Sequence, residues 1–319
     1  MKILITGGSG YKGSILIPKL LEFGHKVINI DTMWFGNFLP NHKNLKNIKS
    51  DIRDIDKIKL GSVDVIIHLA SVANDPMSDL NESLSWEIGA LGTFKLLNFA
   101  KKKGVKKFIY ASSGSVYGIK KEKRVTENLS LKPISLYNKT KMICERVILS
   151  YKNYFDVIII RPATVCGFSP RMRFDLTVNA LTMSALNNKI INVNGGQQIR
   201  PNVNILDLID VYLFFLNKTK TKHNIYNVGF ENLSVLNIAK KVENKIKSKI
   251  IIHKKNFDPR SYRLDSTRLL KEGFKPKRNI EYAVNELITY FNQKKLKNNP
   301  RFYSINWLKT KIIKNGSKI

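Results

Sequence analysis

The chain has 319 residues and is 43% hydrophobic, so it can build a sizeable core and is longer than a typical single domain of about 100–200 residues. No apolar run approaches the ~20 residues that cross a bilayer, so we expect no membrane span; a strand beginning at Lys2 argues against a signal peptide. The net charge of +31, from 55 basic and 24 acidic side chains, attracts polyanions.

This charge leaves two interpretations open. The chain either binds a polyanion, such as nucleic acid or an anionic membrane, or scatters its lysines over solvated helix faces. No basic motif interleaved with aromatic residues is present, so we favour the second and expect no specific nucleic-acid partner. The two cysteines, Cys144 and Cys166, lie in different segments, which fits a reducing cytoplasm and predicts neither a disulfide framework nor a metal site.

Over the first half, short β-branched runs alternate with helical patterns, which is typical of βαβ units and a parallel sheet. We predict strands at residues 2–6, 26–30, 47–49, 63–68, 107–112 and 157–161. We predict helices at 13–23, 81–102 and 136–151. The predicted fold class is therefore α/β, with a doubly wound Rossmann sheet over residues 1–165.

After Gly167 the pattern becomes irregular, which predicts a smaller α+β lobe over 166–293, with a return of the chain to the sheet near 200–225. We predict helices at 176–186, 207–216, 235–246 and 282–291, and strands at 190–193 and 203–206. Residues 294–319 carry basic side chains and no acid. We expect a solvated, partly helical tail there; the alternative is a weak contact with a lipid surface.

Between the first strand and the first helix, residues 7–13 read Gly-Gly-Ser-Gly-Tyr-Lys-Gly. Glycines there allow a tight turn and a close approach to a pyrophosphate, and the helix start supplies free N–H groups. Lys12 replaces a usual apolar residue and either reaches the pyrophosphate or points to solvent. The residues of this turn that we expect at the cofactor are Gly7, Gly10, Tyr11, Lys12 and Gly13.

Two acids follow the next strands. Asp31 ends the second predicted strand, where a carboxylate hydrogen-bonds ribose hydroxyls and repels a 2′-phosphate, which favours NAD over NADP. Asp51 and Ile52 follow the third strand, and we expect them at the adenine. The alternative is a turn role for Asp31 and a structural role for Asp51 and Ile52.

Tyr137 and Lys141 lie four residues apart on a predicted helix, so their side chains leave the same face. A phenol of pKa ~10 is a poor base at neutral pH, but a neighbouring ammonium and a positive nicotinamide ring favour its phenolate. A strand ending near Ser113 precedes this pair, which favours a catalytic pair over a solvated one.

Several motifs occur in a characteristic order: residues 6–13, 68–71, 111–118, 137–141, 161–167 and 258–265. On the basis of these motifs, residues 2–291 resemble an extended short-chain dehydrogenase/reductase of the nucleotide-sugar epimerase/dehydratase family. The resemblance implies NAD as cofactor, Tyr137 as the base, Ser113 at the substrate oxygen and Lys141 at the nicotinamide ribose. It also implies a homodimer formed through two helices, including the helix of Tyr137. Further cofactor contacts implied are Leu69, Ala70, Ser71 and Pro162.

Family members with 4,6-dehydratase activity carry Asp-Glu directly after the catalytic Ser or Thr, but this chain has Gly114 and Ser115 there. Dehydration is therefore disfavoured. The leading prediction is an NAD-dependent nucleotide-sugar epimerase that oxidises one carbinol, at C4, and returns hydride to the opposite face. The alternative is a 4-dehydrogenase or ketoreductase that releases the keto sugar. A non-catalytic dinucleotide-sensing protein is less favoured, because such proteins typically lose the Tyr–Lys pair.

The second lobe is expected to hold a nucleotide-diphosphate sugar, and arginine suits phosphate oxygens. Each arginine alone has the alternative of a solvated or carboxylate-paired charge. The loop 169–173, Ser-Pro-Arg-Met-Arg, resembles a subgroup that acts on surface-polysaccharide and lipopolysaccharide sugars, while Thr164 stands where galactose epimerases have Asn. The sugar and the base stay open. The resemblance implies substrate contacts by Ser113, Thr164, Arg171, Arg173, Asn179, Arg200 and Arg260.

Overall fold

The fold is described from a computed structural model that covers residues 1–254, 261–296 and 298–315. Its main sheet has seven strands in the order β10-β6-β5-β4-β1-β2-β3, and every pairing in it is parallel. The central strands are near-continuous apolar runs because both faces of a parallel sheet are covered, whereas the edge strand β3 carries exposed polar residues. They are β1 (Lys2–Thr6), β2 (Lys26–Asp31), β3 (Leu45–Lys49), β4 (Val65–His68), β5 (Lys107–Ala111), β6 (Asp156–Pro162) and β10 (Ile225–Val228).

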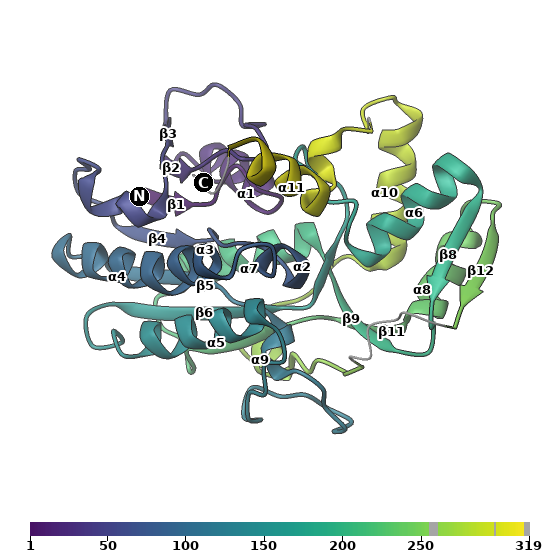
Figure 1. Cartoon of the computed structure of the whole chain (residues 1–319). Helices are drawn as coiled ribbons and strands as arrows, with labels where there is room; N and C mark the ends of the chain where they lie inside the picture. The colour runs from purple at the N-terminus through teal and green to yellow at the C-terminus, as the bar shows by residue number, and fades with distance from the viewer. Residues whose placement is uncertain (255–260, 297, 316–319) are drawn as a thin grey trace.

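Side chains alternate between the two faces of the sheet along each strand, so each face contributes to its own apolar core. Ile3 and Ile5 of β1 point to the face covered by α1 (Gly13–Glu22) and α7 (Ile205–Asn217), whereas Leu4 points to the other face. That face is covered by η1 (Ile52–Lys57), α4 (Gly92–Lys102) and α5 (Leu136–Leu149). Figure 1 shows these helices on the two sides of the sheet. The predicted Rossmann fold is confirmed.

One predicted helix is interrupted. Residues 81–102 form α3 (Glu82–Trp86), a π-helical turn η2 (Glu87–Leu91) and α4 in succession. Sequence analysis missed α2 (Asp75–Ser78) and the short turn η3 (Gly114–Tyr117). It also missed β10, which joins the main sheet beside β6.

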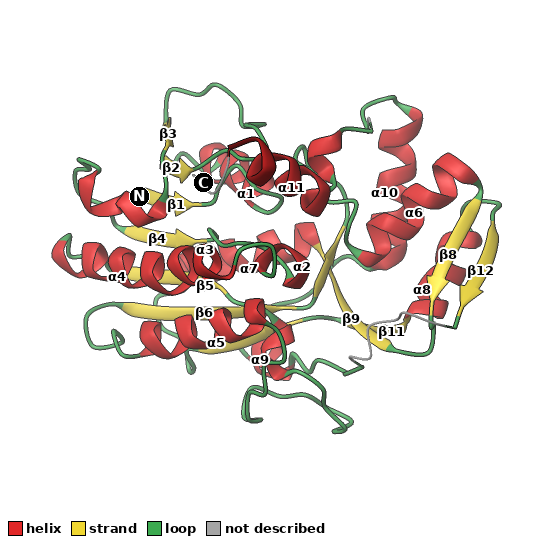
Figure 2. Ribbon diagram, in the orientation of Figure 1, coloured by secondary structure: helices red, strands yellow, loops and turns green. Residues whose placement is uncertain are grey.

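The second half builds a smaller lobe (Figure 2) with its own apolar cluster. One sheet has the order β11-β9-β7 and another pairs β12 with β8. The strand predicted at 203–206 is shifted: β9 ends at Asn204, whose side chain accepts from the Leu206 N–H and starts α7. The elements are β7 (Thr164–Cys166), α6 (Thr177–Asn188), β8 (Ile190–Asn194), β9 (Ile199–Asn204), β11 (Glu231–Ser234), α8 (Val235–Glu243), β12 (Lys249–His253), α9 (Thr267–Lys271) and α10 (Ile280–Asn292).

The C-terminal segment corrects the expectation of a solvated tail. Residues 300–315 form η4 (Pro300–Phe302) and α11 (Ser304–Asn315), which folds back toward the N-terminal half (Figure 1). Phe302 and Leu308 are buried in the two main cores, and the Trp307 indole donates to the Trp34 carbonyl at 2.7 Å. Apolar packing therefore fixes this basic segment. Within the described residues, no helix combines the length and apolar character of a membrane span.

Candidate active site

A cleft of about 470 Å³ lies across the carboxyl ends of the parallel strands, where α/β sheets bind their ligands. Both lobes line it. Most of the predicted cofactor and substrate residues reach it, and several residues that sequence analysis missed do so too. The missed group includes Trp34, Phe35, Asn74, Asp75, Ser115, Asp175, Tyr262, Ser304 and Ile305.

The glycine turn forms the floor of one end. Gly7 has φ +74°, and a Cβ there would lie 2.6 Å from the backbone of Ala70. A Cβ on Gly13 would lie 2.2 Å from the Gly8 carbonyl oxygen, so Gly13 packs α1 against the turn from behind and does not line the cleft. No side chain caps α1; the Ser14 N–H donates to the Gly10 carbonyl at 3.0 Å, and the positive end of the helix faces the turn, where it favours a phosphate. This cradle fits a dinucleotide.

The acid after β2 lies beside this turn. Asp31 accepts hydrogen bonds from the Ser9 N–H at 2.9 Å and the Met33 N–H at 2.7 Å. Burial raises the pKa of its carboxyl group, and the two hydrogen bonds oppose that rise. Asp51 and Ile52 also line the cleft, and the Asp51 carboxylate is paired with Arg53 at 2.9 Å. The structure thus brings these acids to the same end of the cleft.

The edge of the cleft beyond the glycine turn comes from the loops after β4 and β6. Leu69, Ala70, Ser71 and Pro162 line it, as the family resemblance implies for cofactor contacts. His68 is buried behind them between Thr6 and Thr93, with ring-to-hydroxyl distances of 2.6 and 2.9 Å. Burial lowers the pKa of His68 to about 3, so this ring is neutral and structural.

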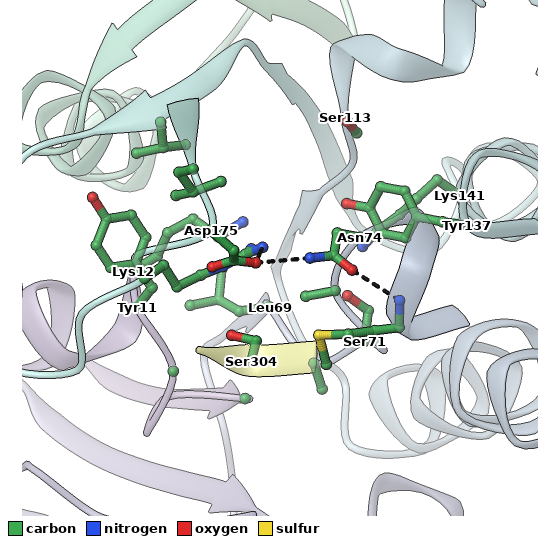
Figure 3. Close-up of a pocket in the computed structure, with 18 of the residues that line it drawn as sticks. Tyr11, Lys12, Leu69, Ser71, Asn74, Ser113, Tyr137, Lys141, Asp175 and Ser304 are labelled. Atoms are coloured by element: carbon green, nitrogen blue, oxygen red, sulfur yellow. Dashed lines mark hydrogen bonds and ion pairs between the residues drawn. The ribbon is translucent and has the colours of Figure 1, made fainter. Parts of the chain in front are cut away.

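Tyr137 and Lys141 enter the cleft from one turn of α5, which Ser135 caps by accepting from the Asn138 N–H at 3.2 Å. The Lys141 ammonium lies 5.8 Å from the Tyr137 ring centroid and donates to the Ala111 carbonyl at 2.7 Å. Figure 3 shows both side chains together, with Ser113 nearby. The carbonyl of β5 therefore fixes the amine beneath the phenol.

Burial sets the proton affinities of this pair. It lowers the pKa of Lys141 to about 8 and raises the pKa of Tyr137 to about 12. Asp75 also raises the Tyr137 pKa, whereas Arg173 and a hydrogen bond with Ser113 lower it. In the absence of a ligand, Tyr137 is therefore protonated at neutral pH, and further positive charge in the cleft is needed to make it a base.

Ser113 is held by a short chain of polar groups. The Ser113 and Ser115 hydroxyl oxygens lie 2.7 Å apart, and Ser115 donates to the Asn138 side-chain oxygen. Ser115 stands where the resemblance places an acid in dehydratases. The structure puts a hydroxyl there that is committed to orienting Ser113.

Across the cleft, the loop between β7 and α6 carries the predicted arginines. Arg173 forms a two-point ion pair with Asp175, at 3.0 and 2.5 Å, and the Asn74 amide donates to Asp175 at 2.8 Å. Figure 3 shows this link from Asn74 to Asp175 spanning the cleft close to Tyr137. Arg173 is thus paired with a carboxylate of its own loop, and the Asn74–Asp175 bond joins this loop to the segment after β4. Thr164 and Arg200 also line the cleft.

Of the three other residues predicted to contact the substrate, two lie in other positions and one is not described. Asn179 is buried behind the cleft, where it donates to the Tyr11 hydroxyl at 3.0 Å and accepts from the Gly167 N–H at 3.0 Å. Its polar atoms hold the loop in place, which corrects its assignment to the substrate. Arg171 lies instead against Phe35 and Ser304, at the cofactor end. Arg260 lies outside the described residues.

A buried ion pair anchors the catalytic helix. Glu145 of α5 accepts from Arg161 of β6 at 2.9 and 2.6 Å, and from the Ser112 hydroxyl at 2.5 Å. Arg161 also donates to the Tyr117 hydroxyl at 2.7 Å. These bonds join the buried face of α5 to the strand ends that carry Ser113. They therefore fix the position of Tyr137 on the same helix.

Comparison with known proteins gives consistent matches over most of the chain. The model of the "NAD dependent epimerase/dehydratase family" matches residues 3–229. The chain is 34% identical over 79% of its length to the uncharacterized UDP-glucose epimerase YtcB of Bacillus subtilis, of which 84% is covered. It is 29% identical to a putative UDP-glucose 4-epimerase of Methanocaldococcus jannaschii, over 94% of this chain and 99% of that protein. A solved UDP-glucose 4-epimerase from Thermotoga maritima superposes with a TM-score of 0.84 at 25% identity, covering 92% of this chain and 99% of that one.

Proposed function

Because this chain is an NAD-dependent enzyme that belongs to the NAD dependent epimerase/dehydratase family, we propose that it epimerises one carbinol, at C4, of a nucleotide-diphosphate sugar. The observation that carries this proposal is the grouping of Tyr137, Lys141 and Ser113 in one cleft, with a hydroxyl at residue 115. By resemblance, the 4,6-dehydratases of this family carry Asp-Glu after the catalytic Ser or Thr, where this chain has Gly114 and Ser115. This difference favours chemistry at a single carbinol.

In this proposal Tyr137 transfers the proton, while Ser113 and Lys141 position and stabilise the reacting groups. NAD, when bound, supplies the acceptor and later the donor of hydride. The Tyr137 phenolate takes the proton of the sugar hydroxyl as the carbinol becomes a ketone, and gives it back when the ketone is reduced. Ser113 donates a hydrogen bond to the same oxygen, and Lys141 favours the phenolate by its charge. Reduction on the opposite face yields the epimer with no net redox change.

Product analysis tests the proposal against its alternative, a 4-dehydrogenase or ketoreductase. The purified protein is incubated with UDP-sugars and GDP-sugars, and the sugar products and the absorbance of NADH are followed. Epimerisation gives the C4 epimer without accumulating NADH. Accumulation of NADH together with a keto sugar contradicts the proposal and supports the dehydrogenase.

The substrate end of the cleft supports a nucleoside diphosphate sugar. Arg200 lies beside Thr164 on the substrate side, where a guanidinium pairs with phosphate oxygens. We assign residues 1–165 to the cofactor and 166–293 mainly to the substrate. The loop at 169–173 supports a surface-polysaccharide sugar as the substrate, and the two buried free cysteines support a cytoplasmic location.

The ionisation of Tyr137 gives a test that needs no substrate. Burial raises its pKa to about 12, so the protonated form dominates at neutral pH in the cofactor-free protein. The positive nicotinamide of NAD⁺ favours the phenolate, so we expect NAD⁺ to lower this pKa toward neutrality and NADH to lower it less. Ultraviolet titration of the phenolate, with Tyr137→Phe as the blank, measures the shift. An equal shift with NAD⁺ and NADH would argue against this electrostatic coupling.

We also propose a homodimer, because large apolar side chains lie exposed on neighbouring helices. Leu91 and Phe94 are 45% and 46% exposed at η2 and α4, and Ile143 of α5 is 36% exposed. A twofold contact would bury this surface on both copies. Phe94→Glu is expected to give a monomer by light scattering, whereas Phe23→Glu, at a phenylalanine directly after α1 that is 64% exposed, is expected to leave the dimer intact. A dimer that survives Phe94→Glu would refute this interface.

A further inference from the structure

Arg171 and Lys12 line the cleft, and neither forms an ion pair with the residues that the structure describes. Arg171 is 3% exposed, and its guanidinium donates to the Met172 carbonyl at 3.2 Å and the Ser304 hydroxyl at 3.0 Å, while its Nε has no partner. Lys12 is half-buried and makes no hydrogen bond or ion pair with any described residue. By contrast, the Arg173 and Arg161 charges each meet a carboxylate.

An unpaired cation out of water is unfavourable unless an anion joins it. Burial and the charge of Arg173 lower the pKa of Arg171 to about 9. Burial and the charges of Lys141 and Arg173 lower the pKa of Lys12 to about 7. A ligand with negative charge between these two groups would offset the cost of burying their charges.

The positions of Arg171 and Lys12 indicate which kind of anion would bind between them. Lys12 lies at the start of α1 in the glycine turn. The loop of Arg171 is fastened onto the same turn, since the Ser169 hydroxyl donates to the Tyr11 carbonyl at 2.8 Å and the Tyr11 hydroxyl donates to the Gly167 carbonyl at 2.6 Å. Both side chains therefore border the N–H groups that suit a phosphate.

The surroundings of Arg171 also separate it from the substrate. Its guanidinium lies 4.1 Å from the Phe35 ring centroid, near Asp31, and its second partner, Ser304, begins α11. Figure 3 shows Ser304 pointing into the cleft on the side of Lys12, with Tyr137 and Lys141 farther along. Thr164 and Arg200, which we expect at the substrate, line the same cleft.

We propose that Arg171, together with Lys12, binds the diphosphate of the NAD cofactor, and that Ser304 of α11 positions Arg171 for this contact. The loop after β7 thus serves the cofactor at Arg171 and not the nucleotide of the substrate. The C-terminal segment is then part of the cofactor site, because Ser304 and Ile305 line it.

Calorimetric titration of the cofactor-free full-length chain tests this assignment with NAD, ADP-ribose, adenosine and UDP as ligands. Arg171→Met is expected to weaken NAD and ADP-ribose binding by about tenfold or more, since it removes charge-assisted hydrogen bonds. Adenosine and UDP affinities stay unchanged, and Arg171→Lys restores part of the loss. Lys12→Met and Ser304→Ala are expected to show the same pattern with smaller losses. Arg124→Met, at an arginine whose side chain is 68% exposed, is the control and changes none of the four affinities.

Unchanged adenosine binding shows that a variant has kept its fold. Equal weakening of adenosine and ADP-ribose would overturn the proposal, because it would show a structural role. Weaker UDP binding with unchanged NAD binding would overturn it in favour of a substrate role for Arg171. None of these measurements depends on which sugar reaction the enzyme performs, so they stand apart from the test of epimerisation.

Discussion

Replacing Tyr137 with phenylalanine is expected to lower kcat by about 10²-fold or more. The change removes only the hydroxyl that carries the proton, while the ring keeps its place over Lys141. Lys141 and Ser113 do not replace that hydroxyl as a base, since Lys141 donates to the Ala111 carbonyl and Ser113 is linked to Ser115. The measurement is the initial rate of epimer formation with the substrate found by product analysis.

Two controls accompany this prediction. NAD affinity and the thermal midpoint of unfolding should change little in Tyr137→Phe, because the phenol is not the anchor of α5. Tyr282→Phe, at a tyrosine of α10 that is 46% exposed, should leave kcat unaltered. If Tyr137→Phe turns over at the wild-type rate, another group carries the proton and the catalytic assignment is wrong.

Replacing Glu145 with glutamine should lower the free energy of unfolding by about 3–5 kcal/mol, because it leaves Arg161 charged and buried without its counter-ion. The Arg161 side chain is 3% exposed and that of Glu145 is 2% exposed, so water cannot compensate. Denaturant unfolding followed by circular dichroism measures the change. Since the pair fixes α5, the loss should be accompanied by a lower kcat even where the protein is folded.

An exposed pair gives the matched control. Lys19 and Glu22 form an ion pair with side chains 46% and 61% exposed, so Glu22→Gln should cost about 1 kcal/mol or less. The double variant Glu145→Leu with Arg161→Met should lose less stability than the sum of the two single changes, because neither buried charge is left alone. A Glu145→Gln protein as stable as Glu22→Gln would show that the buried pair does not anchor the helix.

Local patterns made much of the cofactor half predictable. A strand, a glycine turn and a helix are adjacent in the chain, so residues 2–23 predict a phosphate cradle directly. The spacing of Tyr137 and Lys141 is one helical turn, and the structure brings both into the cleft with Ser113. Asp75 and Asp175 were missed as site residues, since neither has a sequence signal that points toward Tyr137.

The sequence by itself determined the alternation of strands and helices in the first half, the glycine turn and the Tyr–Lys pair, because each depends on neighbours within a few residues. The tertiary structure decided which way the side chains of the loop after β7 point. It buried Asn179 behind Tyr11, 168 residues away, and joined Arg171 to Ser304, 133 residues away. It also placed the basic C-terminal segment against the cleft. Such contacts arise from packing between distant segments, and no periodicity in a single segment specifies its distant partner.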